Sequence, residues 1–198
     1  LDTTFSRVPT TTRTFWVYNR SGDGLRCTSV RLRKGNQTGF RVNVDGMYLG
    51  QASGYQVGGV ELRKDDSLRV FVELTSADTH SEVPELLEDD LVFTLESGVE
   101  QKVNLRAWSW DATLLDGLKI RRDTLIQSTK PIVVKGNIEV DSAATLTIGA
   151  GTTLYFSNHA GIDVYGKLRA EGTPEANVTL RGDRIDRMFD YLPYDRVS

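Results

Sequence analysis

The chain has 198 residues, of which 39% are hydrophobic and 26% are charged, and its formal net charge is −3. This length suits two domains of about 100 residues, and the apolar content excludes a disordered chain. The mixed charges lack the basic face that binding to a nucleic-acid backbone requires, and no apolar run approaches the roughly 18 residues of a membrane span. We therefore expect no nucleic-acid partner and no transmembrane segment.

The N-terminal residues 1–14 are rich in Thr, Ser and Pro and carry little apolar periodicity. This composition favours an extended leader or tether. The chain begins at Leu1, and we expect that a leader has been removed. The single cysteine, Cys27, excludes an intramolecular disulfide, and core packing explains it more simply than a reactive thiol.

Residues 15–110 show short segments of alternating apolar and polar residues, separated by turn clusters. The predicted strands are 15–18, 25–32, 40–44, 57–62, 68–74, 91–95 and 99–105, the last two forming a hairpin across Ser97 and Gly98. The acidic segment 82–90 is predicted to be a solvated loop or a single helical turn. Seven short strands over about 90 residues favour an immunoglobulin-like β-sandwich.

After Trp110 the periodicity changes to pairs of apolar residues two positions apart. The pairs are Ile138 and Val140, Leu146 and Ile148, Leu154 and Phe156, and Ile162 and Val164, with looser repeats at Leu168 and Ala170 and at Val178 and Leu180. Three such strands per turn predict a coil of about 24 residues, typical of a β-solenoid. We expect 111–130 to be a connection and about two coils to precede Gly182.

Segments 136–140, 144–154 and 166–174 resemble the first coils of secreted right-handed β-helix proteins. Segments 42–46 and 181–196 are similar to a family of largely uncharacterised surface lipoproteins of Bacteroidetes. The resemblance implies an all-β fold, with an N-terminal immunoglobulin-like sandwich followed by the first coils of a right-handed parallel β-helix. It also implies an extracytoplasmic place, at the cell surface or in the periplasm of a Gram-negative bacterium. From the same resemblance we expect a lipid anchor upstream of Leu1 and further coils after Ser198. Residues 111–198 would then be the N-terminal part of a truncated β-helix.

Catalytic constellations are missing from the sequence. His80 and His159 lie in turn-like segments of different predicted domains, which disfavours a nucleophile–base triad. With Cys27 they give no zinc-ligand spacing, and no phosphate-binding loop is present. We expect no metal, no cofactor and no catalysis within these residues.

Two aromatic pairs are the candidate binding residues. Trp108 and Trp110 lie two positions apart, so on a strand they share one face. Exposed, they would stack on sugar rings; buried, they would seal the junction between the sandwich and the helix. Tyr191 and Tyr194 admit the same two interpretations, as a sugar platform or as a cap of the last coil.

A modification motif recurs along the chain. Asp followed by Ser or Thr and then by Thr or an apolar residue resembles the O-glycan acceptor triplet of Bacteroidetes. It predicts acceptor hydroxyls at Thr3, Ser67, Thr124 and Ser142. The alternative explanation is that Asp-Ser and Asp-Thr pairs favour turns, although several matches in one chain are suggestive.

Three functions remain open at the level of sequence. The leading hypothesis is a non-catalytic surface scaffold or adhesion-type protein that presents the β-helix to a carbohydrate or a surface protein. The alternative is the N-terminal part of a carbohydrate-active β-helix enzyme, a polysaccharide lyase or hydrolase, with its active coils beyond Ser198. A third is an envelope assembly protein whose open helix end docks another β edge.

Overall fold

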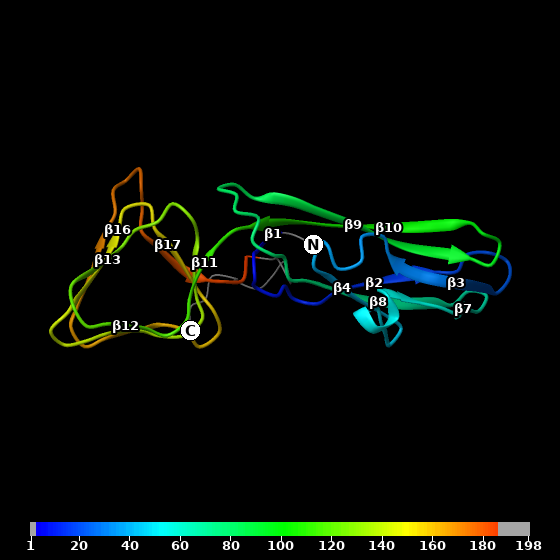
Figure 1. Cartoon of the computed structure of the whole chain (residues 1–198), viewed down its shortest axis with the longest axis horizontal. Helices are drawn as coiled ribbons and strands as arrows, with labels where there is room; N and C mark the ends of the chain where they lie inside the picture. Colours follow the sequence, from blue (N-terminus) through cyan, green and yellow to red (C-terminus); the bar gives the residue numbers. More distant parts are fainter. Residues whose placement is uncertain (1–2, 186–198) are drawn as a thin grey trace. The chain divides into compact units, whose positions relative to one another are not determined.

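The computed structural model describes residues 3–185. The chain divides into two compact units, Leu1–Trp110 and Asp111–Ser198. The first unit runs from blue to green in Figure 1, and the second runs from green to red. The described residues form strands, turns and one short 3₁₀ helix, η1 (Gln51–Ser53).

Two sheets make up the first unit. Sheet A contains, in spatial order, β1 (Thr3–Phe5), β10 (Glu100–Trp110), β9 (Glu85–Leu95), β3 (Leu25–Leu32) and β6 (Gln56–Val57), with β7 (Val60–Leu62) also paired to β3. Sheet B contains β2 (Arg13–Tyr18), β8 (Ser67–Leu74), β4 (Phe40–Val44) and β5 (Met47–Tyr48). Strands β1 and β10 are parallel, and the other neighbours are antiparallel.

One hydrophobic core lies between these sheets. In β8, Leu68, Val70, Val72 and Leu74 are buried, because alternate side chains of a strand point to one face. Buried side chains of β3, β4, β8, β9 and β10 pack in a single cluster. Since both sheets contribute to this cluster, the unit is a β-sandwich, as the alternation in the sequence predicts.

The acidic segment 82–90 differs from its prediction as a loop or a helical turn. Strand β9 begins at Glu85 and pairs antiparallel with β10 over its length, down to Glu85 opposite Ser109. Isolated Asp and Glu disfavour strands, but cross-strand partners of opposite charge offset that preference. The predicted hairpin is confirmed, since Gly98 N–H donates to the Leu95 carbonyl and Leu95 N–H to that of Val99.

Part of the segment 1–14, expected as a tether, belongs to the sandwich. Strand β1 pairs with the end of β10, with Thr3 opposite Trp108 and Phe5 opposite Trp110. Phe5 is buried, and β2 already begins at Arg13. The buried Phe5 side chain and the three residue pairs with β10 stabilise β1, although the sequence of this stretch has only a weak strand pattern.

The second unit is a parallel β-solenoid whose coils have a triangular outline in Figure 1. Sheet C contains β11 (Thr113–Leu115), β14 (Ile132–Val134), β17 (Thr153–Phe156) and β20 (Thr179–Gly182). Sheet D contains β12 (Leu118–Ile120), β15 (Ile138–Val140) and β18 (Ile162–Val164), and sheet E contains β13 (Thr124–Ile126), β16 (Thr145–Gly149) and β19 (Lys167–Glu171). The chain visits the three sheets in turn, which makes about three coils in the described residues.

The interior of the solenoid consists of the apolar pairs seen in the sequence. Ile138 pairs with Ile162, 24 residues further along the chain, as the repeat predicts. Ile138, Val140, Leu146 and Ile148 are fully buried in one cluster. The expectation of a β-helix after the sandwich is therefore confirmed.

The segment 111–130 is the first coil, not a connection, and it raises the count from the predicted two coils to three. It forms β11, β12 and β13, which pair in parallel with β14, β15 and β16. Its strands have three residues each, and Leu125 is 60% exposed. β12 carries one apolar pair, Leu118 and Ile120, but Thr113 and Thr124 interrupt the pairs of β11 and β13, so the spacing that marks the neighbouring coils is incomplete here.

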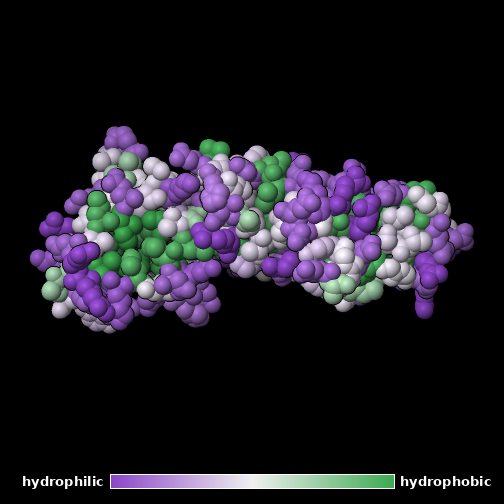
Figure 2. Space-filling view, in the orientation of Figure 1, coloured by the Kyte–Doolittle hydropathy of each residue, from purple (hydrophilic) through white to green (hydrophobic). Residues whose placement is uncertain are grey.

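The last described coil is less buried than the coil beneath it. Leu168 lies opposite Leu146 on the same face of sheet E, yet Leu168 is 41% exposed and Leu146 is fully buried. Val164 and Leu180 are exposed to a similar extent. Figure 2 shows a broad apolar area within the outline of the solenoid, where the coil is viewed end-on.

Candidate functional site

The candidate site is the outer face of sheet B, which carries an unusual number of aromatic rings. Phe15 and Val17 of β2 pack toward the core, so Trp16 and Tyr18 point outward and are 49% and 60% exposed. Phe71 of the neighbouring β8 shares this face with them. Large exposed apolar groups gathered on one face mark interaction surfaces more often than isolated ones do.

The pairing register of sheet B places aromatic side chains of β8 and β5 on the same face as those of β2. Arg69 lies opposite Trp16, and Phe71 lies between Thr14 of β2 and Asn43 of β4. Asn43 in turn lies opposite Tyr48 of β5. We call the set Trp16, Tyr18, Tyr48, Arg69 and Phe71 the aromatic face.

Two arginines stack on these rings. The Arg69 Cζ atom lies 5.5 Å from the Trp16 ring centroid and 4.7 Å from that of Phe71. The Arg20 Cζ atom lies 6.0 Å from the centroid of Tyr18. All three separations fall in the range of cation–π attraction. Among residues 3–185, no carboxylate lies within ion-pair distance of either guanidinium.

A pocket of about 140 Å³ adjoins the rings. Its lining is Thr12, Arg41, Val42, Asn43, Tyr48, Phe71 and Glu73. Arg41 Nη2 donates to Glu73 Oε2 at 3.0 Å and Nη1 donates to the Thr75 hydroxyl at 2.8 Å. The Asn43 side-chain oxygen accepts from Gly46 N–H, which leaves its amide group available as a donor. The pocket thus combines ring walls with oriented polar groups, as sites for small polar ligands do.

The pKa of Glu73 is held below its ordinary value of 4.5. The hydrogen bond from the Thr12 hydroxyl is the largest cause, followed by the hydrogen bond from Arg41, while partial burial acts in the opposite direction. Glu73 is therefore ionised at neutral pH and accepts hydrogen bonds only, which suits the recognition of hydroxyl groups.

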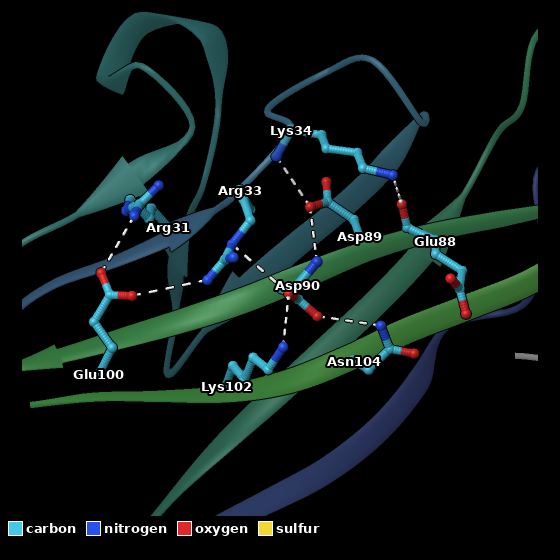
Figure 3. Close-up of polar contacts among 9 residues, drawn as sticks. All are labelled: Arg31, Arg33, Lys34, Glu88, Asp89, Asp90, Glu100, Lys102 and Asn104. Atoms are coloured by element: carbon cyan, nitrogen blue, oxygen red, sulfur yellow. Dashed lines mark hydrogen bonds and ion pairs between the residues drawn. The ribbon is translucent and has the colours of Figure 1, made fainter.

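The outer face of sheet A has a different character, drawn in Figure 3. Asp90 lies 3.7 Å from Arg33 and 3.4 Å from Lys102, and Asn104 donates to it at 3.1 Å. The Asn104 hydrogen bond is the main reason that the pKa of Asp90 is lowered. Glu100 bridges Arg33 and Arg31 at 3.8 and 3.3 Å. The charges of Asp90, Glu100 and their three basic partners therefore satisfy one another.

Asp89, the neighbouring residue of β9, has a structural role. It is buried, and its Oδ1 accepts from the backbone N–H groups of Lys34 and Asp90, at 3.0 and 2.8 Å. Its Oδ2 accepts from the Thr38 hydroxyl. The carboxylate therefore anchors the loop that joins β3 to β4 (Figure 3).

The predicted pair Trp108 and Trp110 does share one face of β10, but the two rings differ. Trp108 is 48% exposed, whereas Trp110 is partly buried. The Trp110 ring lies 6.5 Å from that of Phe5, and its indole N–H is buried with no hydrogen-bond partner among residues 3–185. Trp108 alone is thus open for stacking, and a junction-sealing role of the pair stays a prediction. Tyr191 and Tyr194 lie outside the described residues.

The four predicted O-glycan acceptors lie in different settings. Thr3 is partly buried in β1, Ser67 begins β8, and the Thr124 hydroxyl donates to the Arg122 carbonyl at 2.8 Å. Ser142 is exposed and lines a pocket on the solenoid together with Asp141. Accessibility therefore favours Ser142, and modification of all four stays a prediction.

Groups that could support catalysis are scattered. Cys27 is buried, and burial raises the pKa of its thiol. His80 and His159 both have positive φ, one in each unit, and His159 lies in a turn. Within residues 3–185, no cluster of three His, Cys, Asp or Glu side chains is placed to hold a metal ion. Across the same residues, no helix combines the length and the apolarity needed to span a bilayer.

Comparison with known proteins yields a short match. The chain is 36% identical over 70 residues to "Protein bark beetle" of Drosophila melanogaster, a stretch that is 35% of this chain and 2% of that protein. No family model matches the chain, and no solved structure matches it. The chain thus spans a small part of this relative.

Sequence reasoning missed the aromatic face, although part of its signal was present. A strand over residues 15–18 was predicted, and with Phe15 and Val17 inward, Trp16 and Tyr18 must point outward. The partnership of Trp16 with Arg69 depends on the register between β2 and β8, which lie about 50 residues apart.

Proposed function

We propose that this chain is part of a non-catalytic, extracytoplasmic scaffold whose sandwich binds a glycan through the aromatic face. The observation that carries the proposal is the set of outward rings beside a pocket of oriented polar side chains. Aromatic rings pack against the apolar C–H faces of sugars, and carboxylate, guanidinium and amide groups bind sugar hydroxyls. A surface location agrees with the resemblance of the solenoid coils to those of secreted β-helix proteins.

The β-solenoid suits the scaffold part of this proposal. Its coils stack in register, with a continuous apolar interior. Such stacks are stiff and leave their outer surface to vary. The solenoid would then act as a spacer or as a second surface for a protein partner.

The test is a binding screen of soluble polysaccharides with the 198-residue chain, by affinity electrophoresis and calorimetry. The proposal predicts that at least one polysaccharide binds and that Trp16→Ala weakens it at least tenfold. Trp108→Ala is the matched control, since it removes an equally exposed indole from sheet A. Loss of binding with Trp108→Ala alone would assign the site to the other sheet.

A carbohydrate-active β-helix enzyme is the second candidate, and one observation favours it. Glu139 and Asp163 lie opposite each other on neighbouring coils, on the outer face of sheet D. Lys119 contacts Glu139 at 3.3 Å and Asn137 donates to Asp163 at 2.8 Å. Paired carboxylates serve as acid and base in glycoside cleavage. Release of reducing ends by the chain, abolished by Glu139→Gln, would support this function.

A further inference from the structure

We propose that the aromatic face selects acidic glycans, binding a uronic-acid carboxylate at Arg69. This inference rests on the proposed glycan binding and adds the class of sugar. It starts from a contrast between arginines on the two faces of the sandwich.

The arginines on sheet A have carboxylate partners. Arg26 contacts Glu61 and Glu96, Arg31 contacts Glu100, and Arg33 contacts Asp90. On sheet B, Arg41 is paired with Glu73. Arg69 and Arg20 depart from this pattern, because rings replace carboxylates as their neighbours in the described part of the chain.

Stacking leaves the hydrogen-bonding edge of a guanidinium unused. A ring contacts the flat face of the group, whereas its five N–H donors lie in the plane. The Arg69 Cζ atom lies over both the Trp16 and the Phe71 rings, which restricts the position of its guanidinium while the side chain stays exposed. An oriented fork of donors matches the two oxygens of a carboxylate, and the resulting charge-assisted bonds are strong.

A pyranose carrying a carboxylate fits this arrangement better than a neutral sugar or an acidic peptide does. The carboxylate would meet Arg69 while the sugar ring packs on an adjacent aromatic side chain. The neighbouring pocket of about 140 Å³ is smaller than the roughly 300–1,000 Å³ of sites for drug-sized ligands, which suits a single sugar ring. Asn43 and Glu73 line it and can bind the hydroxyl groups of the next residue in a chain.

Arg20 extends the cationic character along β2. It stacks on Tyr18, which follows Trp16 on the outward side of the strand. A second acidic residue of an oligosaccharide lying along β2 would meet this guanidinium. Affinity should therefore increase from a monomer to an oligomer and fall with added salt.

The experiment compares an oligogalacturonate with the same oligomer after methyl esterification, using calorimetry at two salt concentrations. Alginate and hyaluronan oligosaccharides, each beside its methyl ester, widen the panel, and a neutral galactan oligomer is included. The ester pairs share backbone and hydroxyl groups and differ in the carboxylate charge. We expect one free acid to bind at least tenfold more tightly than its ester.

Three variants test the role of Arg69. Arg69→Gln should reduce affinity for the free acid by about 10- to 100-fold and reduce affinity for the ester by a much smaller factor. Arg69→Lys should restore part of the loss, because the charge returns without the planar fork. Arg106→Gln is the matched control, an exposed sheet-A arginine with a 4.0 Å contact to Glu88. Circular dichroism of each variant checks that the sandwich is folded.

The outcomes separate the two proposals. Equal binding of acid and ester, or binding of the neutral oligomer alone, would overturn the acidic selectivity and keep the glycan-binding function. Unchanged acid binding in Arg69→Gln would also overturn it. Absence of binding to every oligosaccharide would overturn both.

Discussion

The difference in burial between Leu146 and Leu168 leads to a quantitative prediction for the solenoid. The two side chains lie on the same face of sheet E, one coil apart, at 0% and 41% exposure. Leu146→Ala removes buried methyl groups and leaves a cavity, which costs about 3 kcal/mol of unfolding free energy. Leu168→Ala loses part of the transfer energy and leaves no enclosed cavity, so it should cost about 1 kcal/mol.

Urea unfolding followed by far-UV circular dichroism measures both variants. The three tryptophans, Trp16, Trp108 and Trp110, belong to the sandwich, so tryptophan fluorescence follows that unit separately. Both variants should leave the fluorescence transition in place and shift the dichroism transition, Leu146→Ala by more. Equal destabilisation would refute the reasoning, because it would mean that Leu168 is as well packed in solution as Leu146.

Three further predictions concern stability. Gly166→Ala should destabilise the solenoid by several kcal/mol, because a Cβ there would lie 2.2 Å from two backbone carbonyl oxygens. Gly161→Ala is the control in the same urea titration and should leave the stability unchanged, because its Cβ would meet no atom within 4 Å. Asp89→Ala should cost about 2 kcal/mol, measured by tryptophan fluorescence, because it leaves two partly buried backbone donors unpaired. The lowered pKa of Glu73 means that its contribution, a few tenths of a kcal/mol for a surface pair, is present above pH 4.5 and lost as pH falls through the folded-state pKa. The stability gap between wild type and Glu73→Gln should therefore shrink below pH 4.5, and a constant gap would contradict this assignment.

Sequence patterns predict the solenoid best where both members of each apolar pair are large. Ile138 and Val140 form such a pair, and they lie fully buried in β15. The first coil is harder to find in the sequence because Thr113 and Thr124 occupy positions that pair with Ile132 and Leu146 in the next coil. The apolar pair is therefore complete in β12 alone, at Leu118 and Ile120, and one pair does not make a repeat.

The candidate site required tertiary information. Alternation places Trp16 outward, but the contact of the Arg69 guanidinium with the Trp16 ring arises from strand pairing across the sheet. In the same way, the acidic residues of β9 suggest a loop until the basic partners of Asp90, Arg33 just after β3 and Lys102 on β10, are known. Charge compensation between distant segments is a property of the fold, so a single sequence does not reveal it.

The register of the solenoid has an evolutionary consequence. In sheet D, Leu118 pairs with Ile138 after 20 residues, and Ile138 pairs with Ile162 after 24, yet the interior position is kept. The extra residues are taken up at the corners between strands. Insertions at corners can therefore lengthen one surface loop without disturbing the coils above or below it. The architecture allows its outer edges to diversify independently, loop by loop, while the stack of coils stays the same.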